Sequence, residues 1–116
     1  MIDVNSTQKR IAAQKQSFKV AAVQMASGPN IANNLNEAER LIEKAVEQGA
    51  RLVVLPEYFP VMGLNDMAKV AVRENPNQGV IQTFLSKTAR KNKIWLVGGS
   101  IPLVASTSDK VLNSCL

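Results

Sequence analysis

The segment Leu52-Val-Val-Leu55 is an uninterrupted apolar run, and Pro56 and Glu57 follow it directly. A run without polar alternation is typical of a strand that is covered on both faces, as in a parallel sheet. Proline ends such a strand because it has no N–H to donate to a neighbouring strand. We therefore predict a buried strand over residues 52–55 that stops just before Glu57.

The segment before this strand has the pattern of an amphipathic helix. Apolar residues recur at helical spacing from Ile31 to Val46, and four glutamates lie off this stripe. Asn30 or Asn33 fits the start, because an asparagine side chain can accept a hydrogen bond from the first helical turn. Gly49 fits the stop, because glycine readily adopts the left-handed conformation that ends many helices. One helix is therefore predicted between these signals.

Strands and helices alternate in the remainder of the chain. Hydrophobic periodicity and turn residues predict further elements: strands at residues 18–25, 94–97 and 111–116, a long helix at 80–92, a short helix at 66–73, a turn at 74–79 and a polar hairpin-like loop at 105–110. The predicted order, β-α-β-α-β-β, places the chain in the α/β class. Each β-α-β unit should have a right-handed crossover.

The composition is that of an ordinary globular protein. The chain has 116 residues, of which 46% are hydrophobic and 20% charged, so it is one small domain or part of a larger one. Residues 1–17 are rich in polar and charged side chains and contain no apolar core of a signal peptide. We interpret residues 1–17 as a polar leader and residues 18–116 as the domain, with no segment suited to spanning a membrane.

The net charge of +5 does not by itself indicate a nucleic-acid partner. Basic residues gather in the leader and at the end of the second long helix, where cations complement the negative end of the helix dipole. No aromatic side chains lie between them to stack on bases. We expect no nucleic-acid binding.

The single cysteine and the absence of histidine exclude several kinds of disulfide, catalytic and metal site within these residues. Cys115 is the one cysteine, so no intrachain disulfide can form, and the cytoplasm is the expected compartment. The chain contains no histidine, which excludes Ser-His-Asp and Cys-His mechanisms and His-containing metal sites within these residues.

Glu57 is the candidate catalytic residue. It follows a predicted buried strand, and α/β folds place functional groups at the carboxyl ends of strands. Beside Leu55, Tyr58 and Phe59 the carboxylate should be partly desolvated, which suits a general base that works near neutrality. On position alone, a surface loop glutamate or an ion-pair partner remains the alternative.

Several segments, in order, resemble the N-terminal part of the nitrilase superfamily of carbon–nitrogen hydrolases. The similarity covers residues 18–116. It includes an Ala- and Glu-rich helix after the first strand and the segment 89–93 ahead of the third strand. Its short motifs are Ala21–Met25 as A-x-x-Q-M, Leu55-Pro-Glu57 as L-P-E, Gly79 at a helix start, Val97-Gly-Gly-Ser100, and Val111-Leu-Asn-Ser-Cys115 as V-x-N-[ST]. No single motif is specific to this superfamily, but their occurrence together in this order is. On this resemblance the chain would end within its fourth strand and form the N-terminal part of a four-layer αββα sandwich.

The resemblance also implies an activity, the hydrolysis of non-peptide C–N bonds in small amides or nitriles. A Glu-Lys-Cys triad performs it in this family, without a metal or an organic cofactor, and members commonly form homo-oligomers. Glu57 matches the general base of the triad. The lysine, in a Lys-x-His-Leu-like segment, and the nucleophilic cysteine have no counterparts before Leu116. The chain alone is therefore expected to be inactive.

The cysteine and the lysines of the C-terminal half are not predicted to belong to the triad. Cys115 lies within a predicted strand, where we expect it to be buried as a small apolar side chain and not to act as the nucleophile. None of the lysines at positions 87, 91, 93 and 110 stands in the family's lysine motif.

The alternative to a hydrolase is a catalytically inactive relic or interaction module. Which amide or nitrile is the substrate does not follow from these residues.

Overall fold

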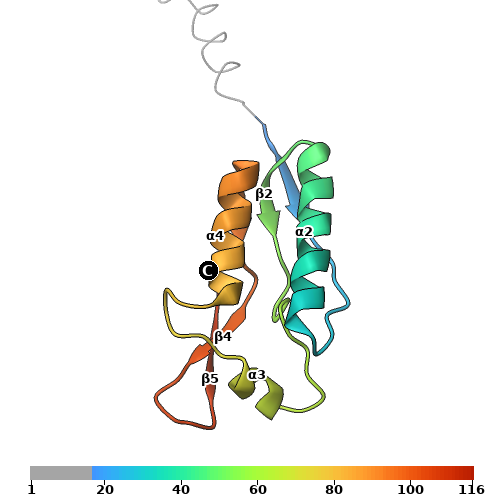
Figure 1. Cartoon of the computed structure of the whole chain (residues 1–116). Coiled ribbons are helices and arrows are strands. Elements are labelled where there is room, and N and C mark those ends of the chain that lie inside the picture. The colour runs from blue at the N-terminus through green and yellow to red at the C-terminus, as the bar shows by residue number, and fades with distance from the viewer. Residues whose placement is uncertain (1–16) are drawn as a thin grey trace, which may run out of the picture.

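The computed structural model describes residues 17–116 (Figure 1). Its elements follow one another in the order β1 (Lys19–Ala22), α2 (Ile31–Glu47), β2 (Ala50–Val54), α3 (Met67–Ala71), α4 (Val80–Asn92), β3 (Trp95–Val97), β4 (Ile101–Val104) and β5 (Val111–Ser114). Residues 1–16 of the predicted leader lie outside the described residues. None of the helices in the described part has the length and apolar character needed to cross a membrane.

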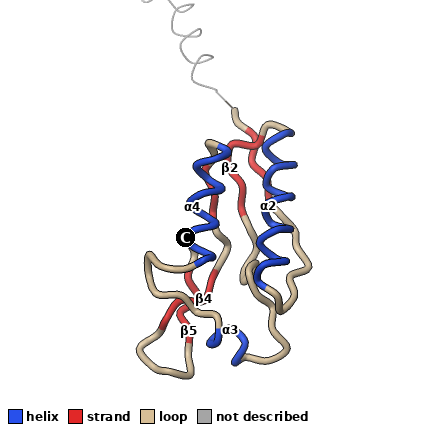
Figure 2. The backbone as a smooth tube through the Cα atoms, in the orientation of Figure 1, coloured by secondary structure: helices blue, strands red, loops and turns tan. Residues whose placement is uncertain are grey.

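The first three strands form one parallel sheet in the order β1-β2-β3. Val53 of β2 lies opposite Ala21 of β1 and Leu96 of β3. Helices α2 and α4 connect these strands and lie together on one face of the sheet (Figures 1 and 2). The α/β class and the parallel sheet are therefore confirmed.

The hydrophobic core lies between this sheet and the two helices. Its buried members include Val53 of β2, Leu55 just after β2, Ala38 and Ile42 of α2, and Ile81 of α4. Burial of a Leu or Ile side chain contributes about 1.5–3 kcal/mol each. The apolar stripe of α2 and alternate residues of the strands thus supply the stability that holds the carboxyl end of β2 in place.

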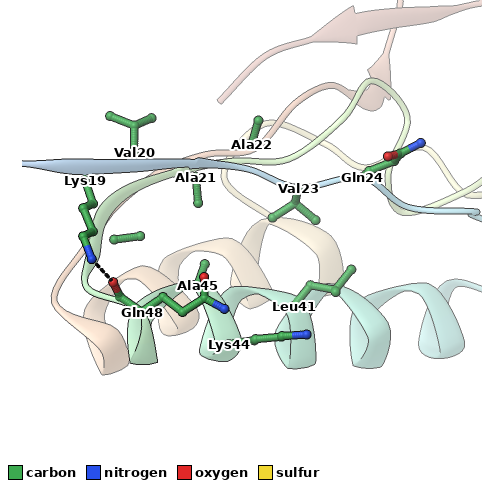
Figure 3. A pocket seen from close by; sticks show the side chains of 11 residues that line it. Lys19, Val20, Ala21, Ala22, Val23, Gln24, Leu41, Lys44, Ala45 and Gln48 are labelled. Carbon is green, nitrogen blue, oxygen red and sulfur yellow. Dashed lines mark hydrogen bonds between the residues drawn. The ribbon is translucent and has the colours of Figure 1, made fainter.

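The opposite face of the sheet is only partly covered within residues 17–116. Val20 and Trp95 have exposed fractions of 57% and 78%. Figure 3 shows Ala21 and Val23 pointing toward α2, whereas Val20 and Ala22 point away from it. The prediction that the central strand is covered on both faces is wrong for the described residues, because α2 and α4 pack on the same face.

An antiparallel hairpin of β4 and β5 follows the sheet, and its first strand was not predicted. A proline inside a short apolar run argues against a strand, and Pro102 lies within β4. The Pro102 carbonyl accepts a hydrogen bond from the N–H of Glu74 at 3.0 Å, and the N–H of Val104 donates to the Glu74 carbonyl at 3.0 Å. The strand predicted at residues 111–116 is therefore the fifth and not the fourth, and it covers Val111–Ser114.

The predicted start and stop of α2 are confirmed. The side chain of Asn30 accepts a hydrogen bond from the N–H of Asn33 at 2.9 Å, so Asn30 and not Asn33 is the capping residue. Gly49 has a φ of 91°, a conformation that glycine adopts without steric cost. The helix thus ends where the sequence indicated, and Gln48 and Gly49 separate it from β2.

The start of α4 is capped by a residue from outside the helix. The buried carboxylate of Glu74 accepts hydrogen bonds from the N–H groups of Ile81 (2.7 Å) and Gln82 (3.0 Å). A negative charge is stabilised at this positive end of the helix dipole. Gly79 makes room for it, because a Cβ atom there would lie 2.1 Å from the Glu74 carboxyl carbon. Glu74 therefore joins α4 to β4.

Candidate active site

Glu57 lies at the carboxyl end of β2, as predicted. The N–H of Leu55 still donates to the Val97 carbonyl of β3 at 3.0 Å, and the chain then enters a turn that contains Glu57. This turn opens the loop that leads from β2 to α3 (Figure 2). The candidate base thus lies where the carboxyl ends of the parallel strands meet, and α/β proteins commonly bind ligands there.

The turn is shaped by the segment that follows β3. Tyr58 has a φ of 48°, a left-handed conformation that a non-glycine residue adopts rarely. Its N–H donates to the hydroxyl of the buried Ser100 at 3.0 Å. Gly99, with a φ of 59°, approaches so closely that a Cβ atom there would lie 2.1 Å from the Pro56 carbonyl oxygen. Strained residues of this kind persist only where neighbouring contacts hold them, and here the Gly99–Ser100 segment provides those contacts.

The carboxylate of Glu57 is exposed and makes one hydrogen bond within the described residues. The side-chain amide of Asn113, on β5, donates to Glu57 Oε1 at 2.8 Å. The predicted partial desolvation is not found in residues 17–116, because the turn places Phe59 in the core while Glu57 stays exposed. No ion pair in the described part involves Glu57, so the ion-pair alternative finds no support there.

The ring of Tyr58 lies against Lys69 of helix α3. The ammonium nitrogen of Lys69, on α3, lies 3.7 Å from the centre of this ring, within range of a cation–π interaction. Burial raises the pKa of the Tyr58 hydroxyl, and the negative charge of Glu57 raises that pKa further. Both causes disfavour the tyrosinate form.

The pKa of Tyr58 provides a test of this arrangement. Tyr58 is the one tyrosine of the chain, so the absorbance of tyrosinate reports on it alone. Glu57→Gln removes the nearby negative charge and should lower the pKa of Tyr58 toward its ordinary value. Burial, the larger cause, should keep the pKa above that value. Glu47→Gln, on the exposed end of α2, should change nothing. An unaltered titration in Glu57→Gln would contradict the placement of this carboxylate near the ring.

The other residues singled out in the sequence lie away from this site or differ from expectation. Cys115 is exposed, so the prediction of burial is wrong. It lies just beyond Ser114, where pairing with β4 ends. Lys91 bridges Glu39 and Glu43 of α2 at 3.2 and 2.8 Å. Among the described residues, no group of three or more histidine, cysteine or acidic side chains is placed to hold a metal ion.

Of the residues around the candidate base, Glu57 and its neighbour Tyr58 were identified from the sequence. Asn113, Ser100 and Lys69 were not assigned to the site. Asn113 and Ser100 belong to the V-x-N-[ST] and Val97-Gly-Gly-Ser100 segments that carry the resemblance, so these motifs were an available signal. Lys69 lies in no such motif. The site therefore unites the ends of β2 and β3 with β5 and α3.

Comparison with known proteins identifies the family of the chain. The family model described as carbon–nitrogen hydrolase matches residues 19–116. The chain is 38% identical over 98 residues to deaminated glutathione amidase of Synechocystis, covering 84% of this chain and 35% of that protein. It is 38% identical over 106 residues to omega-amidase NIT3 of Saccharomyces cerevisiae, covering 87% of this chain and 36% of that protein.

Two solved structures share the fold. Saccharomyces cerevisiae Nit3, a member of branch 10 of the nitrilase superfamily, matches with a TM-score of 0.72 at 35% identity, covering 84% of this chain and 38% of that one. The Caenorhabditis elegans NitFhit protein matches with a TM-score of 0.69 at 27% identity, covering 84% of this chain and 24% of that one. The chain thus spans about a third of the length of the curated relatives, from 31% to 36%.

Proposed function

The chain belongs to the carbon–nitrogen hydrolase family, and we propose that it contributes the general base, Glu57, to an enzyme that hydrolyses small amides or nitriles. The observation that supports this role most directly is the position of Glu57. It lies at the carboxyl end of the central strand of the parallel sheet, on a turn with a strained backbone, with one carboxylate oxygen held by Asn113. A carboxylate that is fixed and open to solvent can exchange protons with a bound substrate.

The proposed reaction on an amide joins Glu57 with the family's lysine and cysteine. Glu57 takes the proton of the cysteine thiol, and the thiolate attacks the carbonyl carbon to form a new C–S bond. The C–N bond then breaks as Glu57 returns the proton to the leaving amine. Glu57 then deprotonates a water molecule, which attacks the acyl carbon. The C–S bond breaks to release the acid as Glu57 returns the proton to the cysteine sulfur. The lysine stabilises the negative charge that develops on the substrate oxygen.

We propose amides as the substrate class in preference to nitriles. The named relatives, from Synechocystis and Saccharomyces cerevisiae, are an amidase and an omega-amidase. No triad lysine or cysteine occupies its motif in residues 18–116, so the proposal requires a longer polypeptide to supply both. The inactive relic or interaction module remains the competing outcome of the test.

The proposal is tested in two steps. The coding region beyond Leu116 should continue in frame through a Lys-x-His-Leu-like segment and a later strand-end cysteine. The polypeptide that it encodes should release ammonia from small amides, and the 116-residue chain alone should not. A stop codon directly after Leu116, or an extended polypeptide without amidase activity, would favour the inactive alternative.

A further inference from the structure

One contact at the site connects two segments that lie far apart in the sequence. Asn113 and Glu57 are separated by 56 positions, and the Asn113 Nδ2–Glu57 Oε1 distance is 2.8 Å. An ionised carboxylate only accepts hydrogen bonds, so the amide NH₂ and not the amide oxygen of Asn113 must face it. Hydrogen bonds to an ionised partner are about twice as strong as those between neutral groups.

The two oxygens of the Glu57 carboxylate differ in their hydrogen bonding. Within residues 17–116, Oε1 of Glu57 accepts the bond from Asn113, and no partner is found for Oε2. An exposed glutamate side chain otherwise samples many rotamers, and ordering such a long side chain costs conformational entropy. A donor that fixes one oxygen leaves the other available for proton transfer in a defined direction.

Asn113 is itself held in place by the rest of the hairpin. It lies opposite Pro102 in the β4–β5 register, and β4 pairs with Glu74 on its other side. Arg73 donates to the carbonyl of Ser108 in the hairpin loop at 2.6 Å. The amide of Asn113 is therefore presented from a supported strand and not from a free loop end.

We infer that Asn113 is a positioning residue for Glu57, which orients the carboxylate so that its second oxygen exchanges the proton. This inference rests on the proposed function, since it assigns a role within that reaction. Asn113 does not itself exchange a proton. Its loss should leave the base present but poorly aligned, and a misplacement of about 1 Å can cost on the order of 100-fold in rate.

Kinetics of the complete hydrolase test the inference. Asn113→Ala and Asn113→Asp should each lower kcat by about 10- to 100-fold with little change in KM. The aspartate keeps the shape of the side chain but removes the donor and adds a like charge. Asn113→Gln, which retains the NH₂ group, should recover part of the rate. Ser114→Ala, the next residue on the same strand, is the matched control and should retain full activity.

A double-mutant cycle separates positioning from a general structural role. In a Glu57→Gln background, Asn113→Ala should cause no further loss, because the group on which it acts is already gone. An equal loss in both backgrounds would overturn the inference. The inference would also be overturned if Asn113→Ala and Asn113→Asp kept the wild-type kcat while Glu57→Gln was inactive. That result would leave the proposed function intact.

A measurement on the 116-residue chain does not depend on activity. In a ¹⁵N-labelled sample, the side-chain NH₂ resonances of Asn113 should move in Glu57→Gln and stay unchanged in Glu47→Gln. If Glu57→Gln leaves these resonances in place, the hydrogen bond is absent in solution and the inference fails. An inactive extended polypeptide combined with the expected NMR shift would instead refute the proposed function.

Discussion

Replacing Glu57 by glutamine in the complete hydrolase is expected to abolish nearly all amide turnover while leaving the fold intact. Glutamine has the same size but cannot take up the thiol proton or activate water, and general acid–base catalysis contributes about 10²- to 10⁴-fold. Because Glu57 is exposed, the substitution should change the free energy of unfolding by no more than about 0.5 kcal/mol. Initial rates of ammonia release and denaturant unfolding measure the two effects.

Glu47→Gln is the matched control for this substitution. Glu47 is also an exposed glutamate, at the last position of α2, and takes part in no ion pair of the described part of the chain. It should retain full turnover. If Glu57→Gln retained a rate within a few-fold of the unmodified enzyme, Glu57 would be a surface glutamate without a catalytic role.

Gly99→Ala is expected to have the largest effect on stability at the site. The left-handed φ of 59° disfavours any residue with a Cβ atom, by about 1–2 kcal/mol. The added Cβ would also lie 2.1 and 2.5 Å from the carbonyl oxygens of Pro56 and Leu55. Backbone atoms cannot move aside as a side chain does, and overpacking adds about 1–3 kcal/mol. The free energy of unfolding should therefore fall by about 2–5 kcal/mol.

Gly28→Ala is the control for this second prediction. No atom lies within 4 Å of a Cβ at Gly28, so the free energy of unfolding should change by less than about 1 kcal/mol. Urea unfolding followed by far-ultraviolet circular dichroism measures both variants. A Gly99→Ala variant as stable as Gly28→Ala would show that the close approach of Gly99 to the end of β2 is not maintained in solution.

Local sequence patterns predicted most of the elements correctly. The helix expected from Ile31, with Asn30 or Asn33 at its start and Gly49 at its stop, is found at Ile31–Glu47 with Asn30 as its cap. These signals are reliable because a helix depends on residues within one or two turns of each other. The missed strand β4 shows the limit of such patterns. Pro102 argues against a strand by itself, and only its pairing with Glu74 and β5 makes one possible.

The environment of Glu57 was predicted less well than its position. The apolar neighbours Tyr58 and Phe59 suggested a partly buried carboxylate, but the turn buries Phe59 and leaves Glu57 exposed. Cys115 was expected in a buried strand and is exposed one residue past the end of pairing. Burial at the end of an element depends on which other segments pack there, and a local pattern does not contain that information.

Local signals in the sequence predict the α/β class, every element except β4, the family and the position of Glu57 just after the central strand. These features follow from side-chain period, capping residues and short motifs, all set by near neighbours in the chain. The three-dimensional packing sets which face of the sheet α2 and α4 cover. It also brings Ser100 and Asn113 to the turn at Glu57, across 42 and 56 positions. Such contacts depend on the simultaneous packing of several elements, because two distant side chains meet only when every segment between them has been placed.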